Sequence, residues 1–482
     1  MNASLISLEL AVIGLGLVFL MLDLWTPAPR KRQLGYAAAA AVVILLCFSF
    51  FADTSFVRFA FKESYAFDPL ALYFKRFFLL AGAIVLLLQV EFADRLATGI
   101  AEYYSLTLLA LAGMMFTASA TNFAVLFVAL EVVTITFYVL TSFQRNHLLS
   151  LEAGVKYLIM GGLASAFMVF GIAFIYGAAG TFAFVDIAEQ SANLAGNTIF
   201  LIGLLFVVIG LSFKIAAFPY QMWAPDVYQG SPAPTTAFLA VGSKAAGFVL
   251  LLRLVYGVAP NVFHQWTTVL LSMAALSILY GNLCAIAQTS LKRIFGYSSI
   301  AHAGYLLLGL AALSSAGASA VLYYLTGYLF TVLAAFAVMV IALRQVESDD
   351  MECIAGLGER SPLLAAALTL SMASLAGIPP LAGFIGKFLL FKAALAEGVR
   401  QPAFYLTVAV AVIGVVISIW YYFGVIRAIY WPRHQADRAV IAVSTPMQGV
   451  LWVCIAGMLF LGAFPSRVLE LAQGAVALLA RH

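Results

Sequence analysis

The chain has 482 residues, of which 64% are apolar and only 10% are charged, and its mean hydropathy is +1.05. Because a soluble domain carries roughly 25% charged residues, there is too little charge here to cover a water-soluble surface of this size. Outer-membrane barrels show alternating segments of about ten residues rather than long apolar runs. The composition excludes a soluble enzyme and a disordered chain, and it predicts an all-α polytopic membrane protein.

The net charge of +4 is modest and the basic residues are scattered, which argues against a nucleic-acid partner. The chain shows neither a GxGxxG dinucleotide fingerprint nor a Walker A loop. Its cysteines lie far apart and none forms a CxxC pair, so metal, iron–sulfur and disulfide frameworks have no support in the sequence. These cysteines are Cys47, Cys284, Cys353 and Cys454. We therefore expect no cofactor and no metal in this chain.

Polar, proline and glycine residues divide the chain into about fourteen apolar spans that could cross a bilayer. In chain order the predicted spans lie near 4–24, 34–52, 70–90, 104–119, 121–142, 153–177, 198–219, 234–256, 266–287, 294–312, 317–343, 361–396, 403–430 and 447–465. Span 361–396 is too long for a straight crossing, so it must tilt, bend or break.

The distribution of cations between the loops predicts the orientation. After the first span come Arg30, Lys31 and Arg32, and loops of the same parity hold Arg95, Arg145, Lys292, Arg293, Arg344, Arg360, Arg433 and Arg438. The opposite loops and the carboxyl end hold Arg58, Lys62, Arg400, Arg467 and Arg481. Because the cation-rich side of a membrane protein faces the cytoplasm, we expect both termini outside, in agreement with an even number of spans.

A few ionisable residues remain deep inside the predicted spans: Glu131, Lys156, Lys214, Lys244, His302 and Lys387. Each central lysine costs roughly 2.5–3.5 kcal/mol on insertion scales, although Lys156 lies close enough to a span end to snorkel toward the headgroups. One deep carboxylate against four amines cannot balance the charge, so some lysines should be neutral at any moment. Such lysines can pass protons on, and His302 suits a relay because histidine titrates near neutral pH.

Two spans contain helix breakers beside their lysines. Pro219 follows Lys214 and displaces the carbonyl of Ile215, four residues back. The run 377–387 contains two prolines and three glycines, which should open the helix and free the carbonyls of Leu375 and Ala376. Broken backbone at membrane depth survives only where protein or a watery cavity satisfies it, so these breaks favour a transport site over a simple kink.

The two broken spans lie five apart in the chain, as do the spans that hold Glu131 and His302. A shift by an odd number of spans reverses direction, which predicts the inverted repeats typical of transporters. The expected organisation is helices 1–3 over residues 1–103, a first five-helix repeat over 104–256, a second, inverted repeat over 257–430, and a final helix over 431–482.

Three stretches, 213–235, 288–302 and 377–387, resemble the signature of the antiporter-like membrane subunits of complex I, the proton-pumping NADH:quinone oxidoreductase. Within that family, Trp223-Ala224-Pro225-Asp226-Val227-Tyr228-Gln229-Gly230 and a lysine at 387 look like the subunit N branch. Subunit M typically has glutamate at the latter position, and subunit L typically carries a long carboxyl-terminal helix. The resemblance covers nearly the whole chain.

The resemblance implies a role for each buried residue. Glu131 would pair with Lys214, Lys244 would relay protons to a central His302, and Lys387 would serve the outward half-channel, with Lys156 and Lys292 as supporting members. FMN, iron–sulfur clusters and quinone would lie on partner subunits, where NADH is oxidised. Subunits M and K are the expected neighbours, in the lipid bilayer of the bacterial inner membrane.

Two alternatives stay open. The first is a subunit of a multisubunit Na⁺/H⁺ antiporter or a membrane-bound hydrogenase, which share the equivalents of Glu131, Lys214 and Lys387. The second is a structural scaffold in which the charges only fix helix packing. The scaffold predicts that neutralising Lys214 weakens assembly, while any assembled complex still pumps normally.

Overall fold

The computed structural model describes residues 3–52, 57–344, 346, 348–431 and 439–477. Among these residues, 13 helices are long and apolar enough to cross a membrane, and the remaining predicted span, 361–396, is divided into two shorter helices. The prediction of an all-α polytopic membrane protein is confirmed. The predicted loop cations Arg433, Arg438 and Arg481 lie outside the described residues.

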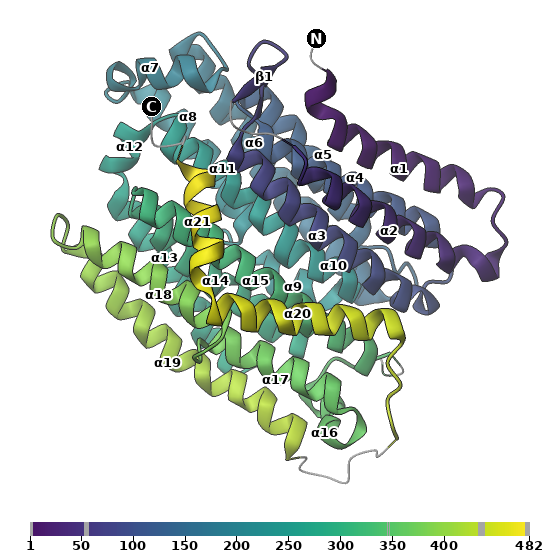
Figure 1. Cartoon of the computed structure of the whole chain (residues 1–482). Coiled ribbons are helices and arrows are strands. Elements are labelled where there is room, and N and C mark those ends of the chain that lie inside the picture. Colours follow the sequence, from purple (N-terminus) through teal and green to yellow (C-terminus); the bar gives the residue numbers. More distant parts are fainter. Residues whose placement is uncertain (1–2, 53–56, 345, 347, 432–438, 478–482) are drawn as a thin grey trace.

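The amino-terminal part consists of three helices and one hairpin, on one flank of the molecule in Figure 1. Its elements are α1 (Ser7–Asp23), α2 (Lys31–Ser49), β1 (Arg58–Ala60), β2 (Tyr65–Phe67) and α3 (Pro69–Phe92). The antiparallel strands pair Arg58 with Phe67. Asp68 begins α3, because its carboxylate accepts a hydrogen bond from the Ala71 amide at 2.7 Å and a proline at the first helical position needs no donor of its own.

The next part of the chain contains an interrupted helix. In chain order its elements are α4 (Ile100–Ser119), α5 (Phe123–Thr141), α6 (Leu148–Ala179), α7 (Phe184–Leu194), α8 (Thr198–Ile215), α9 (Trp223–Gly230), α10 (Ala233–Phe238), a π-helical turn (Leu239–Ser243) and α11 (Lys244–Gly257), and the interruption lies between α8 and α9. The π-turn leads directly into Lys244, and such turns are frequent at functional sites.

The following part of the chain contains a second broken helix. In chain order its elements are α12 (Pro260–Gln265), α13 (Thr267–Ile286), α14 (Leu291–Ala311), α15 (Ser315–Ala342), α16 (Leu357–Arg360), α17 (Pro362–Ala376), α18 (Ala382–Glu397) and α19 (Ala403–Tyr430), and the break lies between α17 and α18. Helices α20 (Thr445–Ala463) and α21 (Pro465–Val476) complete the described chain. In Figure 1, α20 crosses the front of the view and α21 turns away from it at Pro465.

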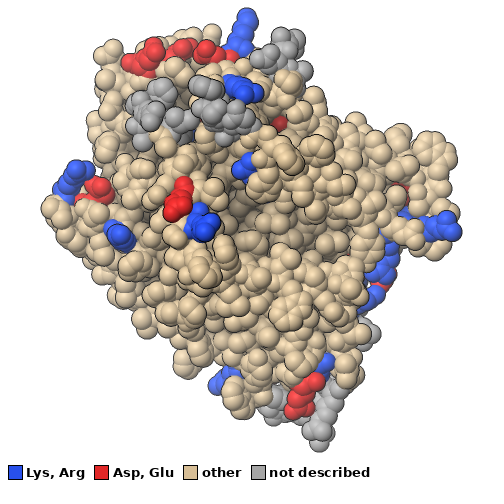
Figure 2. Space-filling view, viewed as in Figure 1, with Lys and Arg blue, Asp and Glu red and all other residues tan. Residues whose placement is uncertain are grey.

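The middle of the bundle is its most buried part. The 18-residue apolar windows of Ala233–Gly257 and Leu291–Ala311 are 100% and 94% buried, whereas that of α19 is 33% buried. Figure 2 shows one outer face, on which uncharged side chains cover most of the area. A wide uncharged belt around a buried centre is what lipid contact requires, and it leaves α11 and α14 as the natural place for a protected site.

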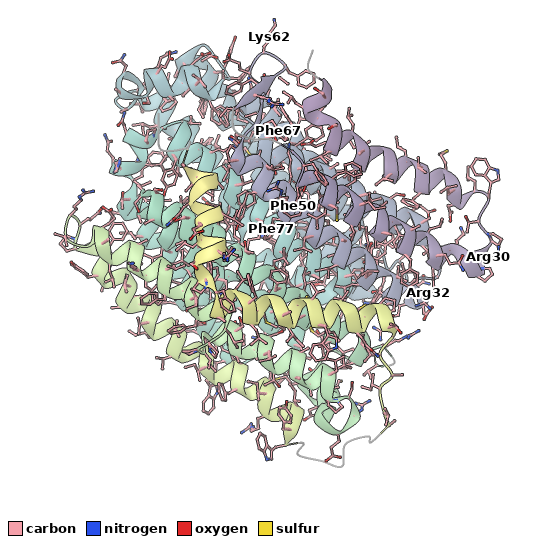
Figure 3. All side chains as sticks on the ribbon, viewed as in Figure 1. Arg30, Arg32, Phe50, Lys62, Phe67 and Phe77 are labelled. Atoms are coloured by element: carbon pink, nitrogen blue, oxygen red, sulfur yellow. The ribbon has the colours of Figure 1, made fainter. Side chains whose placement is uncertain are left out.

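The basic loops gather on one end of the bundle. Arg32 contacts Asp94 at 3.0 Å, and Arg344 pairs with Glu91 at 3.1 Å and also with Asp94. Figure 3 shows Arg30 and Arg32 at one end of the α1–α2 hairpin and Lys62 at the opposite end of the molecule. These loops lie together as the distribution of cations requires, although which face meets the cytoplasm stays a prediction.

Three short elements differ from the sequence prediction. The span count leaves residues 220–233 as a loop between spans, but α9 lies there with Trp223, Val227 and Tyr228 buried. The hairpin and the amphipathic α7 occupy connections that the span count treated as loops. Each is too short or too polar to show as an apolar run, so hydropathy alone does not reveal it.

Candidate proton-transfer site

Four of the predicted residues, Lys214, Lys244, His302 and Lys387, are between 2% and 4% exposed. They come from α8, α11, α14 and α18, which are neighbouring elements in the middle of the bundle. We call these four residues the central row.

The first lysine of the central row lies at the end of a broken helix, as predicted. Helix α8 stops at Ile215, and Ala216 turns into the left-handed region with φ 57°. The indole of Trp223 donates to the Phe213 carbonyl at 3.0 Å, which satisfies backbone near the break. The Lys214 ammonium donates to the hydroxyl of Thr134 on α5.

Among the described residues, Glu131 and Lys214 do not form a direct ion pair. The carboxylate of half-buried Glu131 accepts instead from the Ser165 hydroxyl on α6 at 2.5 Å. Thr134, the partner of Lys214, follows Glu131 by nearly one turn of α5, so the carboxylate still acts on Lys214 through space. The pairing that the family resemblance implied is therefore indirect in this structure.

Two buried hydroxyls lie between the first and second lysines of the row. The Tyr157 hydroxyl interacts with that of Ser243, and neither has a further hydrogen-bond partner among the described residues. The Lys214 ammonium is 5.8 Å from the centre of the Tyr157 ring, and Ser243 directly precedes Lys244. Because buried polar groups are normally hydrogen-bonded, these two hydroxyls mark a place where water would complete the contacts.

The second lysine contacts the helix that carries the histidine. The Lys244 ammonium donates to both the carbonyl and the hydroxyl of Ser299 on α14. The Ser299 hydroxyl also lies 2.9 Å from that of Tyr228. Ser299 precedes His302 by three residues, so a single turn of α14 separates the two groups.

His302 is held by tyrosines on both ring nitrogens. Its Nδ1 contacts the hydroxyl of Tyr324, and its Nε2 lies 3.1 Å from that of Tyr422. The Tyr422 hydroxyl in turn contacts Ser298. A neutral imidazole with a hydroxyl at each nitrogen can accept a proton on one side and release one on the other.

The last member of the row spans the second break. Helix α17 ends at Ala376, α18 begins at Ala382, and the Lys387 ammonium donates to the carbonyls of Leu375 at 2.6 Å and Ala376 at 3.3 Å. These are the two carbonyls that the prolines were predicted to free. The ammonium also lies 5.1 Å from the centre of the Tyr305 ring, one turn beyond His302.

The second break is shorter than expected, because residues 382–386 are helical rather than open. The glycines serve close packing instead. A side-chain carbon at Gly383 would lie 1.8 Å from the Ser374 carbonyl oxygen, and one at Gly386 would lie 2.5 Å from the Tyr324 ring. Small residues at helix contacts allow backbones to approach closely.

The supporting lysines lie apart from the central row. The Lys156 side chain is 42% exposed and pairs with Glu152 at 2.7 Å and Asp226 at 2.6 Å, unlike the buried members of the central row. Its face of α6, rather than its distance from the helix end, decides its exposure. Lys292 is half-buried and donates to the carbonyls of Gln229 and Ser231.

Asp226 ties α9 to two helices at the end with the basic loops. It accepts from Lys156 at 2.6 Å and from Arg293 at 2.8 Å. Burial alone would raise the pKa of Asp226, but these two hydrogen bonds hold it below its ordinary value.

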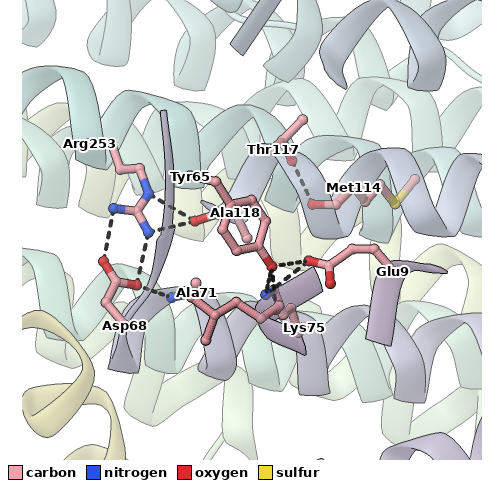
Figure 4. Close-up of polar contacts among 10 residues, drawn as sticks. Glu9, Tyr65, Asp68, Ala71, Lys75, Met114, Thr117, Ala118 and Arg253 are labelled. Atoms are coloured by element: carbon pink, nitrogen blue, oxygen red, sulfur yellow. Dashed lines mark hydrogen bonds and ion pairs between the residues drawn. The ribbon is translucent and has the colours of Figure 1, made fainter. Parts of the chain in front are cut away.

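Sequence reasoning missed a second set of buried charges. Glu9 on α1 and Lys75 on α3 are both fully buried and form an ion pair of 2.9 Å, so the inventory of a single deep carboxylate was wrong. Asp68 and Arg253 form a second buried pair at 2.9 Å, and Figure 4 shows both pairs. All four lie near helix ends, where a side chain normally reaches water, so their position along the chain does not reveal their burial.

No three histidine, cysteine or carboxylate side chains meet in a metal-binding group anywhere in the described part of the chain. The predicted site consists of ionisable groups and hydroxyls, with Lys214 and Lys387 beside the two breaks and Lys244 and His302 on the uninterrupted helices α11 and α14.

The comparisons with known proteins show the family of the chain. A transmembrane family described as NADH:quinone oxidoreductase/Mrp antiporter matches residues 120–418, which include the whole central row. In fold, the chain is also similar to a chain of an Mrp complex from Dietzia sp. DQ12-45-1b, with a TM-score of 0.83, 22% identity and coverage of 100% of this chain and 98% of that one. The chain belongs to the NADH:quinone oxidoreductase/Mrp antiporter family.

Its full-length relatives narrow this class to one branch. The chain is 38% identical to the NADH-quinone oxidoreductase subunit N of Trichlorobacter lovleyi, over 99% of this chain and 98% of that protein. It is also similar to a chain of respiratory complex I from Thermus thermophilus, with a TM-score of 0.79, 31% identity and coverage of 97% and 100%. Among the branches of the family, it falls with the N subunits.

Proposed function

We propose that this chain carries protons across the bacterial inner membrane along the central row, as the N subunit of an NADH:quinone oxidoreductase. The observation that carries the proposal is the burial of four ionisable groups on adjoining elements, with hydroxyls between them. Intramembrane ionisable residues are rare and costly, and they commonly mark ion pathways.

The charges of the row favour stepwise transfer. Lys244 and Lys387 both act on His302 through space, and like charges in a poorly solvated interior repel strongly. A proton on one member therefore disfavours a proton on the next, so a proton that arrives at Lys244 promotes release from Lys387. Tyr324 and Tyr422 supply the hydroxyl contacts through which His302 would exchange protons, and Ser299 contacts Lys244.

Both broken helices offer an ammonium the same stabilisation. Lys214 lies in the last turn of α8, and Lys387 donates to the last carbonyls of α17. The carboxyl-terminal end of a helix carries partial negative charge and favours a cation. Small changes in geometry at each break would then decide whether the lysine beside it is charged or neutral.

We also propose that residues 104–256 and 257–430 are the inverted repeats. In each, the third membrane-spanning helix, α6 or α15, is long, and the next membrane-crossing segment is broken. With the basic loops in the cytoplasm, protons would be taken up near Lys214 and released outside near Lys387.

The energy must come from elsewhere, since moving one charge against 100 mV costs about 2.3 kcal/mol. We propose that partner subunits supply it by oxidising NADH and reducing quinone, with FMN and the iron–sulfur clusters held there and no redox centre in this chain. The cysteines are dispersed over the sequence, which suits no iron–sulfur group. Subunits M and K are the proposed neighbours.

Proton pumping by assembled complexes in vesicles tests the proposal, using Lys214→Met against Lys156→Met as the matched control. Lys156 is exposed and ion-paired at the bundle end, so we expect its substitution to leave pumping nearly unchanged. Lys214→Met should reduce pumping about tenfold or more at equal complex abundance. Normal pumping by an assembled Lys214→Met complex would favour the scaffold, and pumping that stops without Na⁺ would favour the Na⁺/H⁺ alternative.

A further inference from the structure

The last two helices of the described chain meet the second break directly. Helices α20 and α21 join at residues 461–465, which we call the elbow, and the chain turns there (Figure 1). A side-chain carbon at Gly462 would overlap the Pro380 carbonyl and would lie 2.9 Å from Leu381 Cα. Since small residues allow membrane helices to approach closely, glycine at this position lets α20 touch the linker between α17 and α18.

A hydrogen bond fixes the elbow to α15. The Tyr323 hydroxyl donates to the Leu461 carbonyl at 2.5 Å, and both residues are buried. Together with Ala382, the first residue of α18, they form a small apolar cluster against which Val468 of α21 packs. The carbonyls in the last turn of a helix have no helical donor, so the tyrosine completes the bonding of α20 and ties the elbow to α15 and α18.

Helix α15 also contacts the central row and both sides of the break. Tyr324, which follows the tyrosine of the elbow contact, binds His302 Nδ1 through its hydroxyl. Further along α15, the Thr331 hydroxyl lies 3.0 Å from that of Ser374 on α17. The Ser374 hydroxyl accepts in turn from the Gly383 amide of α18 at 3.1 Å. The two helices of the break are therefore held by α15 as well as by the elbow.

The contacts of Lys387 depend on the geometry of this break. Its ammonium donates to the carbonyls of Leu375 at 2.6 Å and Ala376 at 3.3 Å, and a side-chain carbon at Gly377 would lie 3.2 Å from Lys387 Cδ. The donor belongs to α18 and the acceptors belong to α17, so these bonds exist only while the two helices keep their relative position. A displacement of about 1 Å along the shorter bond would leave no hydrogen bond.

We propose that Gly462 is a positioning residue for Lys387, because the elbow holds the linker of residues 377–381 and thereby keeps the ammonium within reach of the freed carbonyls. The inference rests on the proposed role of Lys387 in proton release. Helix α20 lies toward the outside of the bundle, since its apolar window is 39% buried, and it follows residue 418, where the family match ends. A movement of this peripheral helix would thus act on the last member of the central row.

Gly462→Ala in the assembled complex tests the proposal, with Gly449→Ala as the matched control. Gly449 lies on the same helix, and no heavy atom of the described chain lies within 4 Å of a side-chain carbon added there. In a high-resolution structure of the Gly462→Ala complex, we expect the Lys387 ammonium to lie farther than about 3.5 Å from the Leu375 carbonyl. Pumping in vesicles should fall about tenfold, because a small misplacement of a reacting group is costly. Gly449→Ala should keep both the contact and the pumping.

An unchanged contact between Lys387 and Leu375 in assembled Gly462→Ala overturns the proposal, whatever the rate of pumping. A lost contact together with normal pumping would support the positioning role of Gly462 and would contradict the proposed function of Lys387. The structure of the variant and its pumping therefore distinguish a failure of this inference from a failure of the proposed function.

Tyr323→Phe covers the case in which Gly462→Ala does not assemble. It keeps the ring but removes the hydroxyl that binds the Leu461 carbonyl, so it releases the elbow from α15 without adding bulk. We expect the Lys387 contact to lengthen and pumping to fall about fivefold, the factor for one hydrogen bond. Tyr73→Phe is the control, because its hydroxyl contacts a threonine of the same helix rather than the elbow. The same Lys387 contact in both tyrosine variants would overturn the proposal.

Discussion

The Lys387 ammonium on α18 is bound by the Leu375 carbonyl on α17, at 2.6 Å, across the break between the two helices. The residue that the membrane should exclude is thus held by the carbonyls that the prolines leave without helical donors. The buried ammonium and the freed carbonyls stabilise one another, because an unpaired carbonyl and an unpaired ammonium would both be costly at this depth.

Lys387→Met should remove the contact between the ammonium and these carbonyls. The loss of the ammonium leaves the carbonyls of Leu375 and Ala376 without their donor, at about 1–3 kcal/mol for each unsatisfied group, and it removes one member of the row. We expect pumping to fall about tenfold or more and thermal stability to decrease. Lys392→Met, on the exposed side of the same helix, is the control. Equal pumping by the two variants would contradict a transfer role for Lys387.

Glu131→Gln should preserve assembly but lower pumping and coupled turnover. The amide oxygen can still accept from Ser165, so packing is retained, while the negative charge that acts on Lys214 is lost. The exposed carboxylate Glu470 provides the control as Glu470→Gln. Normal pumping by a fully assembled Glu131→Gln complex would falsify the role of this charge.

The contribution of Asp226 should depend on pH. Its pKa is held below the ordinary value by Lys156 and Arg293, so its ion pairs stabilise the fold above the unfolded pKa, near 3.9, and this contribution is lost as the pH falls through the lower folded pKa. Because the side chain is 34% exposed, we expect about 1 kcal/mol or less.

Thermal unfolding of the wild type and Asp226→Asn at several pH values measures this contribution. The difference in Tm should be constant from pH 7 to about pH 5, begin to shrink at about pH 4, and disappear only when the pH falls below the lowered folded pKa of Asp226. A difference that grows on acidification would mean that the aspartate is not stabilised as an anion.

Cysteine labelling tests the orientation. Gln229 is unsuitable as a probe because it lies half-buried against Lys292 and Arg293. Asn146 and Val399 are exposed, at opposite ends by span parity. With a membrane-impermeant maleimide, Asn146→Cys should react only from the cytoplasm and Val399→Cys only from outside, relative to the chain without added cysteine. The reverse pattern would overturn the orientation and the proposed direction of transfer.

The sequence by itself determined the class of protein, most of the spans and the place of both breaks. It also determined that backbone carbonyls would be freed before Pro379, where Leu375 and Ala376 now accept from Lys387. These features follow from local chemistry: apolar length sets a span, and a proline ring removes a donor and displaces the carbonyl four residues back.

Only the tertiary structure decided which charged residues meet. Lys156 and Lys75 both lie near a span end, yet Lys156 is exposed and Lys75 is fully buried against Glu9. Glu131 and Lys214 were expected to pair, but α5 and α6 turn the carboxylate toward Ser165. Depth along a helix can be counted from the sequence, whereas the face that a side chain presents to another helix depends on how distant segments pack, which no local pattern records.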